Sequence, residues 1–253
     1  MPTALDAAPA PLSMRKLRWG RAGGRRTLLV HGVQSSANSW WRIADALAQA
    51  GVHVTAPDLR GHGQSPRAST YGLHDFVADL LDLGSGWDLV VGHSLGGTLV
   101  AHMLAADPGF ARQAVLLDPV FRLPEENFDE LVAGQLEELA ATDAAAMQTA
   151  HPTWHPEDCR IKAQAAAACS PFVNEAILRE NRPWDYSELL ARTESPALVL
   201  GADPAAGGML DPNLAAGLAA RNEQVTYRQL SGVGHSIHRD RPQAVIDALL
   251  EVI

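Results

Sequence analysis

The sequence predicts an α/β protein with a mostly parallel central sheet flanked by helices. Short apolar runs typical of buried strands alternate with amphipathic segments of helical periodicity, a pattern that favours a parallel sheet covered on both faces. The segment Asp88–Thr98 reads D-L-V-V-G-H-S-L-G-G-T and places a G-x-S-x-G turn between such a strand and such a helix. The length of 253 residues suffices for one large domain with a substantial core.

The individual elements follow this rhythm along the chain. Residues 1–13 are rich in Ala and Pro and predict a flexible leader. Strands are predicted at Met14–Gly20 (an edge strand), Thr27–Val30, Val52–Ala56, Leu89–Val91, Ala114–Leu117, Pro196–Gly201 and Val225–Leu230. Helices are predicted at Trp40–Ala50, Leu73–Leu83, Thr98–Ala106 and Pro242–Val252.

A different pattern covers Val120–Thr193, where no convincing strand is found and Ala and Glu are abundant. Ala163–Ala168 and Glu175–Glu180 favour helix. Another helix is indicated by apolar side chains at helical spacing, namely Phe128, Leu131, Val132, Leu136 and Leu139. We therefore expect residues 120–193 to form a helical cap inserted into a core made of residues 14–119 and 194–253.

Ser94 is the candidate nucleophile, because a serine at a sharp strand-to-helix turn is lifted above the sheet edge at the positive end of a helix. Such a serine needs a base, and His235 lies on a Gly-rich loop just after the last predicted strand. It also needs an acid to orient the base, and Asp203 follows the strand that ends at Gly201. The order Ser, Asp, His along the chain is that of one known type of catalytic triad.

An oxyanion hole requires backbone N–H groups aimed at the developing negative charge. One donor is expected from Leu95, the residue after the nucleophile. The other is expected from Val33, on the loop after the strand Thr27–Val30, with its neighbour Gln34 as the alternative.

Five segments together resemble the α/β-hydrolase superfamily, and in particular its capped serine esterases and lactonases. They occur in the order of that superfamily and span nearly the whole chain. They are H-G-V-Q-S-S at 31–36, A-P-D-L-R-G-H-G-Q-S at 56–65, G-H-S-L-G-G at 92–97, L-G-A-D-P at 200–204 and G-V-G-H-S at 232–236. The resemblance implies an α/β-hydrolase fold in which the loop Asp58–Ser65 supports the pocket floor without taking part in catalysis.

The identity of the acid stays open in one respect. Members of the superfamily usually have two residues between the glycine and the acid, whereas only Ala202 separates Gly201 from Asp203. The stretch that follows is also long, so Asp211 is an alternative. Some members carry the acid after the preceding strand, which would be Asp118, although that residue could simply cap the turn before Pro119. We prefer Asp203.

The resemblance implies a serine hydrolase that cleaves a small to medium carboxylic ester or lactone through an acyl-enzyme intermediate. Hydrolysis of C–C bonds or thioesters would use the same triad, and a ligand sensor with slow turnover is an alternative of a different class. Epoxide hydrolases and haloalkane dehalogenases carry Asp at the position of Ser94, and hydroxynitrile lyases carry Lys at the position of Ser236, so these activities are disfavoured. No cofactor and no metal site are expected, since no phosphate loop or dinucleotide fingerprint occurs.

Substrate preference is expected to depend on the cap. The candidate pocket residues are Gln34 and His93 from the core loops and Phe121, Phe128, Trp154 and Trp184 from the cap.

The composition limits the partners. The net charge is −9, and residues 120–193 hold 6 Lys or Arg against 13 Asp or Glu, which argues against nucleic acids, anionic membranes and the steering of strongly anionic substrates. No apolar run is long enough for a membrane span, and the N-terminus lacks the pattern of a secretory signal. With two cysteines and no zinc spacing, we expect a cytoplasmic monomer or homodimer whose partner is a small ester or lactone.

Overall fold

The computed structural model describes residues 10–253 with the exception of residue 142. Seven strands form one sheet in the order β1-β3-β2-β4-β5-β6-β7. All neighbours are parallel except β1, which pairs antiparallel with β3 at the edge. The strands are β1 Lys16–Trp19, β2 Arg26–Val30, β3 His53–Pro57, β4 Leu89–His93, β5 Ala114–Leu117, β6 Ala197–Gly201 and β7 Val225–Gln229. The predicted mostly parallel sheet is confirmed.

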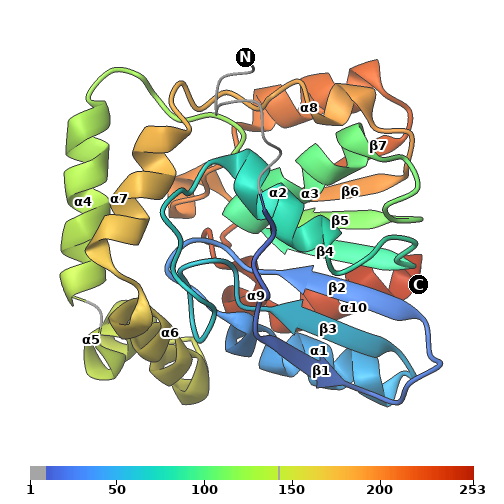
Figure 1. Ribbon diagram of the computed structural model, residues 1–253, viewed down its shortest axis with the longest axis horizontal. Coiled ribbons are helices and arrows are strands. Elements are labelled where there is room, and N and C mark those ends of the chain that lie inside the picture. Colours follow the sequence, from blue (N-terminus) through green and yellow to red (C-terminus); the bar gives the residue numbers. More distant parts are fainter. Residues whose placement is uncertain (1–9, 142) are drawn as a thin grey trace.

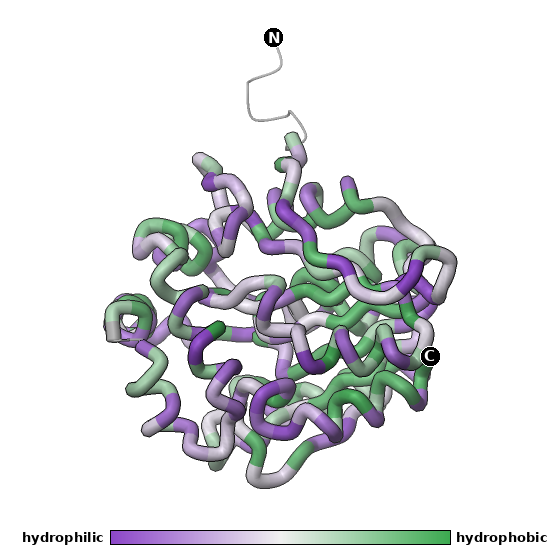
Figure 2. Tube along the Cα trace, turned by 90° about the horizontal axis from the view of Figure 1, so that it is seen from below, coloured by the Kyte–Doolittle hydropathy of each residue, from purple (hydrophilic) through white to green (hydrophobic). Residues whose placement is uncertain are grey.

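Helices cover both faces of this sheet, as Figure 1 shows. On one face α1 (Trp41–Gln49) and α10 (Pro242–Val252) bury apolar side chains against the strands. On the other face α2 (Leu73–Leu81), α3 (Leu95–Ala106) and α8 (Pro212–Arg221) do the same. The inner strands β4, β5 and β6 are buried along their whole length, which explains their continuous apolar sequences. Figure 2 shows hydrophobic and hydrophilic stretches alternating along the chain.

The segment between β5 and β6 is helical, and we call residues 120–193 the cap. Its helices lie to one side of the sheet, next to the ends of the central strands (Figure 1). They are α4 (Phe128–Ala141), α5 (Ala144–Ala150), α6 (Pro156–Ala168) and α7 (Pro171–Glu180). The indole of Trp184 donates to the carbonyl of Val120 at 2.7 Å and joins the two ends of the cap where they leave the core.

The structure differs from the sequence-based expectations at two places, the start of α3 and the end of the expected flexible leader. Helix α3 starts at Leu95 rather than Thr98, because the chain enters the helix directly after Ser94. Residues 1–9 of the expected flexible leader lie outside the described residues, but the backbone N–H of Leu12 donates to Asp79 Oδ1 at 2.6 Å, so the end of that segment is held. Among the described residues no helix combines the length and apolar character that a membrane crossing requires.

Candidate active site

Ser94 lies between β4 and α3 with φ 56° and ψ −122°, a backbone conformation that a residue with a side chain rarely adopts. Two glycines allow the tight turn. A Cβ on Gly92 would lie 2.3 Å from the carbonyl oxygen of Gly96, and a Cβ on Gly96 would lie 2.2 Å from the carbonyl oxygen of Val30. The turn therefore depends on glycine at both positions, and it presents the Ser94 side chain at the start of a helix.

His235 is held by a carboxylate through its Nδ1 atom, which lies 2.6 Å from Asp118 Oδ2. Because a carboxylate accepts, Nδ1 donates to it, which leaves Nε2 as the ring nitrogen that can exchange a proton with another group. Asp118 follows β5, is fully buried and has a positive φ of 41°.

The carboxylate of Asp118 also accepts three backbone N–H groups, from Ala202 at 3.0 Å, Met209 at 2.8 Å and Leu210 at 3.3 Å. Hydrogen bonds of this kind favour an ionised carboxylate in a buried place. The residue can thus orient His235 and stabilise its protonated form.

The preference for Asp203 as the partner of His235 is corrected by this geometry. Asp203 Oδ1 accepts from the N–H of Ala205 at 2.9 Å and Oδ2 accepts from the N–H of Gly232 at 2.8 Å. These two bonds lower the pKa of Asp203. The carboxylate thus fixes the loop that leads to His235 without reaching the ring. The other alternative, Asp211, caps α8 by accepting from Asn213 N–H at 2.8 Å.

A cavity of about 520 Å³ is lined by both Ser94 and His235. Val33 and Leu95, the expected oxyanion donors, line the same cavity. Gln34, next to Val33, has a positive φ of 54° and turns the loop sharply.

Gln34 joins this loop to the cap. Its Nε2 donates to the carbonyl of Gln135 on α4 at 3.0 Å and to Asn174 Oδ1 on α7 at 3.2 Å. Its Oε1 accepts from Lys162 Nζ on α6 at 3.3 Å. Three cap helices are therefore connected to the loop that carries Val33.

His93 lines the cavity, but its Nε2 donates to the carbonyl of His235 at 2.9 Å. Burial is the main reason that the pKa of His93 lies well below its ordinary value, so the ring is neutral. The residue predicted to bind substrate therefore also holds the backbone of His235 in place.

The remaining pocket candidates divide into two groups. Gln34, Trp154 and Trp184 line the cavity. Phe121 and Phe128 are buried in the hydrophobic cluster that packs the cap on the core, and they do not line the cavity among the described residues. Periodicity identifies the apolar face of a helix, but it does not separate packing positions from those that border a hollow.

Several polar cavity residues were not identified from the sequence. Lys162 comes from α6, His151 follows α5, and Arg239 lies on the short helix α9 (Ile237–Asp240). Their residue types are ordinary for solvated helices, and only the fold places them at the cavity that Ser94 also lines. The one available signal was that Arg239 follows His235 by four residues.

The Asp58–Asp79 segment, which follows β3, is hydrogen-bonded to the loop that carries Val33. Asp58 Oδ1 accepts from Ala37 N–H at 2.7 Å, and His31 Nε2 accepts from Leu59 N–H at 3.0 Å. His31 Nδ1 in turn lies 2.7 Å from the carbonyl of Gly32, so the neutral ring bridges the two segments. Burial lowers the pKa of His31.

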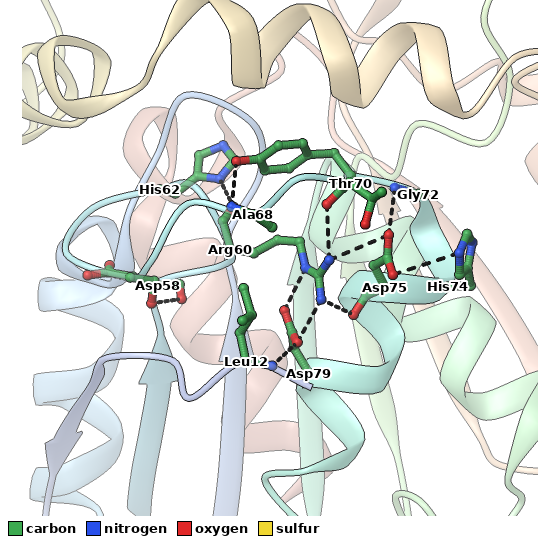
Figure 3. Close-up of polar contacts among 12 residues, drawn as sticks. Leu12, Asp58, Arg60, His62, Ala68, Thr70, Gly72, His74, Asp75 and Asp79 are labelled. Carbon is green, nitrogen blue, oxygen red and sulfur yellow. Dashed lines mark hydrogen bonds and ion pairs between the residues drawn. The ribbon is translucent and has the colours of Figure 1, made fainter. Parts of the chain in front are cut away.

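Arg60 organises the interior of the same segment, as Figure 3 shows. Its Nε donates to Asp79 Oδ2 at 2.7 Å and its Nη2 to Asp79 Oδ1 at 2.8 Å. Its Nη1 donates to the carbonyl of Thr70 at 3.0 Å and lies 3.4 Å from Asp75 Oδ2. Every nitrogen of this buried guanidinium has an acceptor. These hydrogen bonds hold the segment together and offset part of the free-energy cost of burying the charges.

Comparison with known proteins identifies the family. A model of the alpha/beta hydrolase family matches residues 27–248. The chain belongs to the alpha/beta hydrolase family. A lipase, LipV of Mycobacterium tuberculosis, is 38% identical over 123 residues, which are 47% of this chain and 46% of the lipase. A putative carbamate hydrolase of Variovorax paradoxus is 30% identical over 200 residues, 72% of this chain and 75% of that protein.

The structural comparison agrees on the fold. A thermophilic esterase from Thermogutta terrifontis superposes with a TM-score of 0.76 at 21% identity, covering 97% of this chain and 94% of the esterase. At this identity the likeness concerns the fold alone. The first curated relatives share less than half of their length with the chain, 46% for the lipase and 32% for an epoxide hydrolase of Mycobacterium tuberculosis.

Proposed function

We propose that the protein is a serine hydrolase that cleaves a small to medium carboxylic ester or lactone. The observation that carries the proposal is the buried Asp118–His235 pair, 2.6 Å apart, in a cavity that Ser94 also lines. A neutral histidine held at Nδ1 by a carboxylate is suited to remove a proton with Nε2.

In the proposed reaction, His235 Nε2 takes the hydroxyl proton while Ser94 Oγ attacks the carbonyl carbon. The backbone N–H groups of Val33 and Leu95 stabilise the oxyanion. His235 then protonates the leaving oxygen, which gives an acyl-enzyme and an alcohol. A water molecule, deprotonated by the same ring, releases the acid.

Relatives named as a lipase and a putative carbamate hydrolase support cleavage of acyl bonds. Ser94 disfavours epoxide hydrolysis, because epoxide hydrolases of this superfamily carry an aspartate at the position of the nucleophile. Hydrolysis of C–C bonds or thioesters stays compatible with the same residues.

The test is turnover of a panel of aryl esters, aliphatic esters and lactones by the wild type and by Ser94→Ala. We expect the wild type to hydrolyse at least one class, and the variant to lose kcat by about 10⁴-fold or more while it folds normally. Activity retained by the folded variant would refute the role of Ser94.

Two results would redirect the proposal. No hydrolysis of esters or lactones, together with cleavage of a thioester or a C–C bond, would replace the substrate class. Tight ligand binding with turnover far below about 1 s⁻¹ would favour a sensor.

A further inference from the structure

Arg239 is a buried cation on the wall of the active-site cavity. It lies on α9, four residues after His235, and only 3% of its surface is exposed. Its Nη1 donates to Ser236 Oγ at 3.1 Å, and its Nη2 lies 3.5 Å from Ser35 Oγ. The guanidinium carbon lies 5.2 Å from the centre of the Trp154 ring. All of these partners are neutral.

In the part of the chain that the structure describes, Arg239 forms no ion pair and its Nε has no hydrogen-bond partner. The nearby carboxylates of Asp158 and Asp240 favour the charged guanidinium electrostatically, but neither forms a direct ion pair with it. Asp240 Oδ1 accepts from the Trp154 indole at 2.6 Å, and Asp158 pairs with Arg42. Burial lowers the pKa of Arg239 to about 10, so the group stays charged at neutral pH.

A buried cation without a hydrogen-bonded counter-charge is unfavourable unless another group supplies one. Arg239 lines the cavity, and each of its two Nη groups carries two N–H bonds but has one hydroxyl partner among the described residues. The missing acceptor can therefore come from a molecule in the cavity, which is also the place where Ser94 meets its substrate.

The charges around the cavity restrict that molecule. Lys162 also lines it, but its Nζ is 3.6 Å from Glu138 Oε1 and 3.3 Å from Gln34 Oε1. Glu138 and Asp240 line the cavity as well. These two carboxylates repel a doubly charged phosphate more strongly than a singly charged anion, so a single carboxylate is the better fit for Arg239. The planar guanidinium matches a carboxylate with two parallel hydrogen bonds.

We propose that Arg239 binds a free carboxylate of the substrate, so that the natural substrate is an ester or lactone that carries a carboxylate in addition to the bond that is cleaved. This inference rests on the proposed hydrolase function and specifies its substrate class. It also gives Arg239 the role of a specificity-determining residue. The acidic surface of the cap, which argued against steering of anions, does not decide affinity inside the cavity.

The test compares p-nitrophenyl hydrogen glutarate with its methyl ester. Both are aryl esters with the same acyl chain, but only the first carries a free carboxylate. We expect the wild type to prefer the charged ester in kcat/KM. Arg239→Gln should lower that preference by about 10- to 100-fold, as expected for a charge-assisted pair, mainly through KM. Arg239→Lys should keep part of the preference for the charged ester, because the positive charge remains. The matched control is Arg241→Gln, which removes the same charge from an exposed side chain two residues away and should keep the full preference.

A direct binding measurement separates this inference from the proposed function. Glutarate and its dimethyl ester are titrated calorimetrically into the wild type and into each Arg239 variant that retains the wild-type circular dichroism spectrum. Binding of glutarate that Arg239→Gln abolishes would support the carboxylate site even if neither aryl ester is cleaved, in which case only the proposed function fails.

Three outcomes would overturn the inference. The wild type could hydrolyse both esters equally and bind glutarate no better than the dimethyl ester. Arg239→Gln could keep the preference for the charged ester. Inorganic phosphate could bind more tightly than glutarate, which would assign a phosphorylated substrate instead.

Discussion

In the Asp58–Asp79 segment a buried arginine is surrounded by acceptors, whereas in the active-site cavity a buried arginine lies against two hydroxyl groups and an indole ring. Arg60 pairs with Asp75 and Asp79 and donates to backbone carbonyls (Figure 3). Arg239 has a nitrogen without any partner among the described residues. A polar network that is complete without a ligand indicates a structural role, whereas one that is incomplete at the wall of the candidate active-site cavity supports the binding role proposed above.

This contrast separates two kinds of substitution. Changes in the Asp118–His235 pair should lower the turnover of the folded protein, and changes in the Asp58–Asp79 segment should lower stability while the folded fraction keeps its turnover. Asp118, Arg60 and His62 test this separation.

The largest effect is expected for Asp118→Asn. The amide cannot stabilise protonated His235, and it can favour the wrong ring tautomer, so kcat should fall by about 10⁴-fold. Asp203→Asn is the matched control, because its side chain bonds only backbone N–H groups in the described part of the chain, and it should lose less than about 10-fold. Steady-state kinetics on an aryl ester measures the loss of kcat in each of the two variants. A larger loss for Asp203→Asn than for Asp118→Asn would restore Asp203 as the acid.

The next largest effect is a lower free energy of unfolding for Arg60→Met. The change leaves Asp75 and Asp79 buried without their cation, and removal of one partner of a buried ion pair costs about 3 to 5 kcal/mol. Urea unfolding followed by circular dichroism measures it, with the exposed Arg67→Met as control. We expect kcat per folded molecule to stay near that of the wild type. A stable variant with lost turnover would contradict the assigned structural role.

A smaller, pH-dependent effect is expected for His62→Gln. Burial is the main cause that lowers the pKa of His62 from 6.5 to about 3, so between these values the unfolded chain binds a proton that the folded protein does not. The contribution to stability is therefore complete above pH 6.5 and is lost as the pH falls. Between pH 7.5 and 5.0 this residue should account for about 2 kcal/mol of the decrease in unfolding free energy.

Urea unfolding at both pH values measures the decrease for the wild type and for His62→Gln. The variant should show the smaller decrease, since glutamine does not titrate. Equal decreases would mean that His62 is not neutral in the folded protein. The buried rings of His31, His93 and His238 act in the same direction, so a dependence on pH should remain.

The sequence was sufficient to predict the sheet and the turn at Ser94, because buried parallel strands and a G-x-S-x-G turn leave local signals. The acid was harder, since Asp118 directly follows β5 and Asp203 follows β6 by one intervening residue, so both lie just after a strand. Which of them reaches His235 depends on the path of residues 205–211, which brings the N–H groups of Met209 and Leu210 to Asp118. Local sequence patterns do not predict the path of residues 205–211.

The same limit applies to the pocket. Phe128 and Trp184 were equal candidates by side-chain type, yet Trp184 borders the cavity and Phe128 packs inside the cluster. Arg239 was not considered, because a charged residue near a helix start usually faces solvent. Its burial comes from the cap residue Trp154, about 85 positions away in the chain, as the contact of 5.2 Å shows.

The bonds of Gln34 have a consequence for protein engineering. Exchanging the cap for that of another member of the family is an obvious way to seek new substrates. In this protein the exchange would remove the acceptors from Gln135 and Asn174 and the donor from Lys162. A graft that ignores them would leave a buried amide unsatisfied beside Val33, so a transplanted cap should carry equivalent polar groups or be combined with a new residue at position 34.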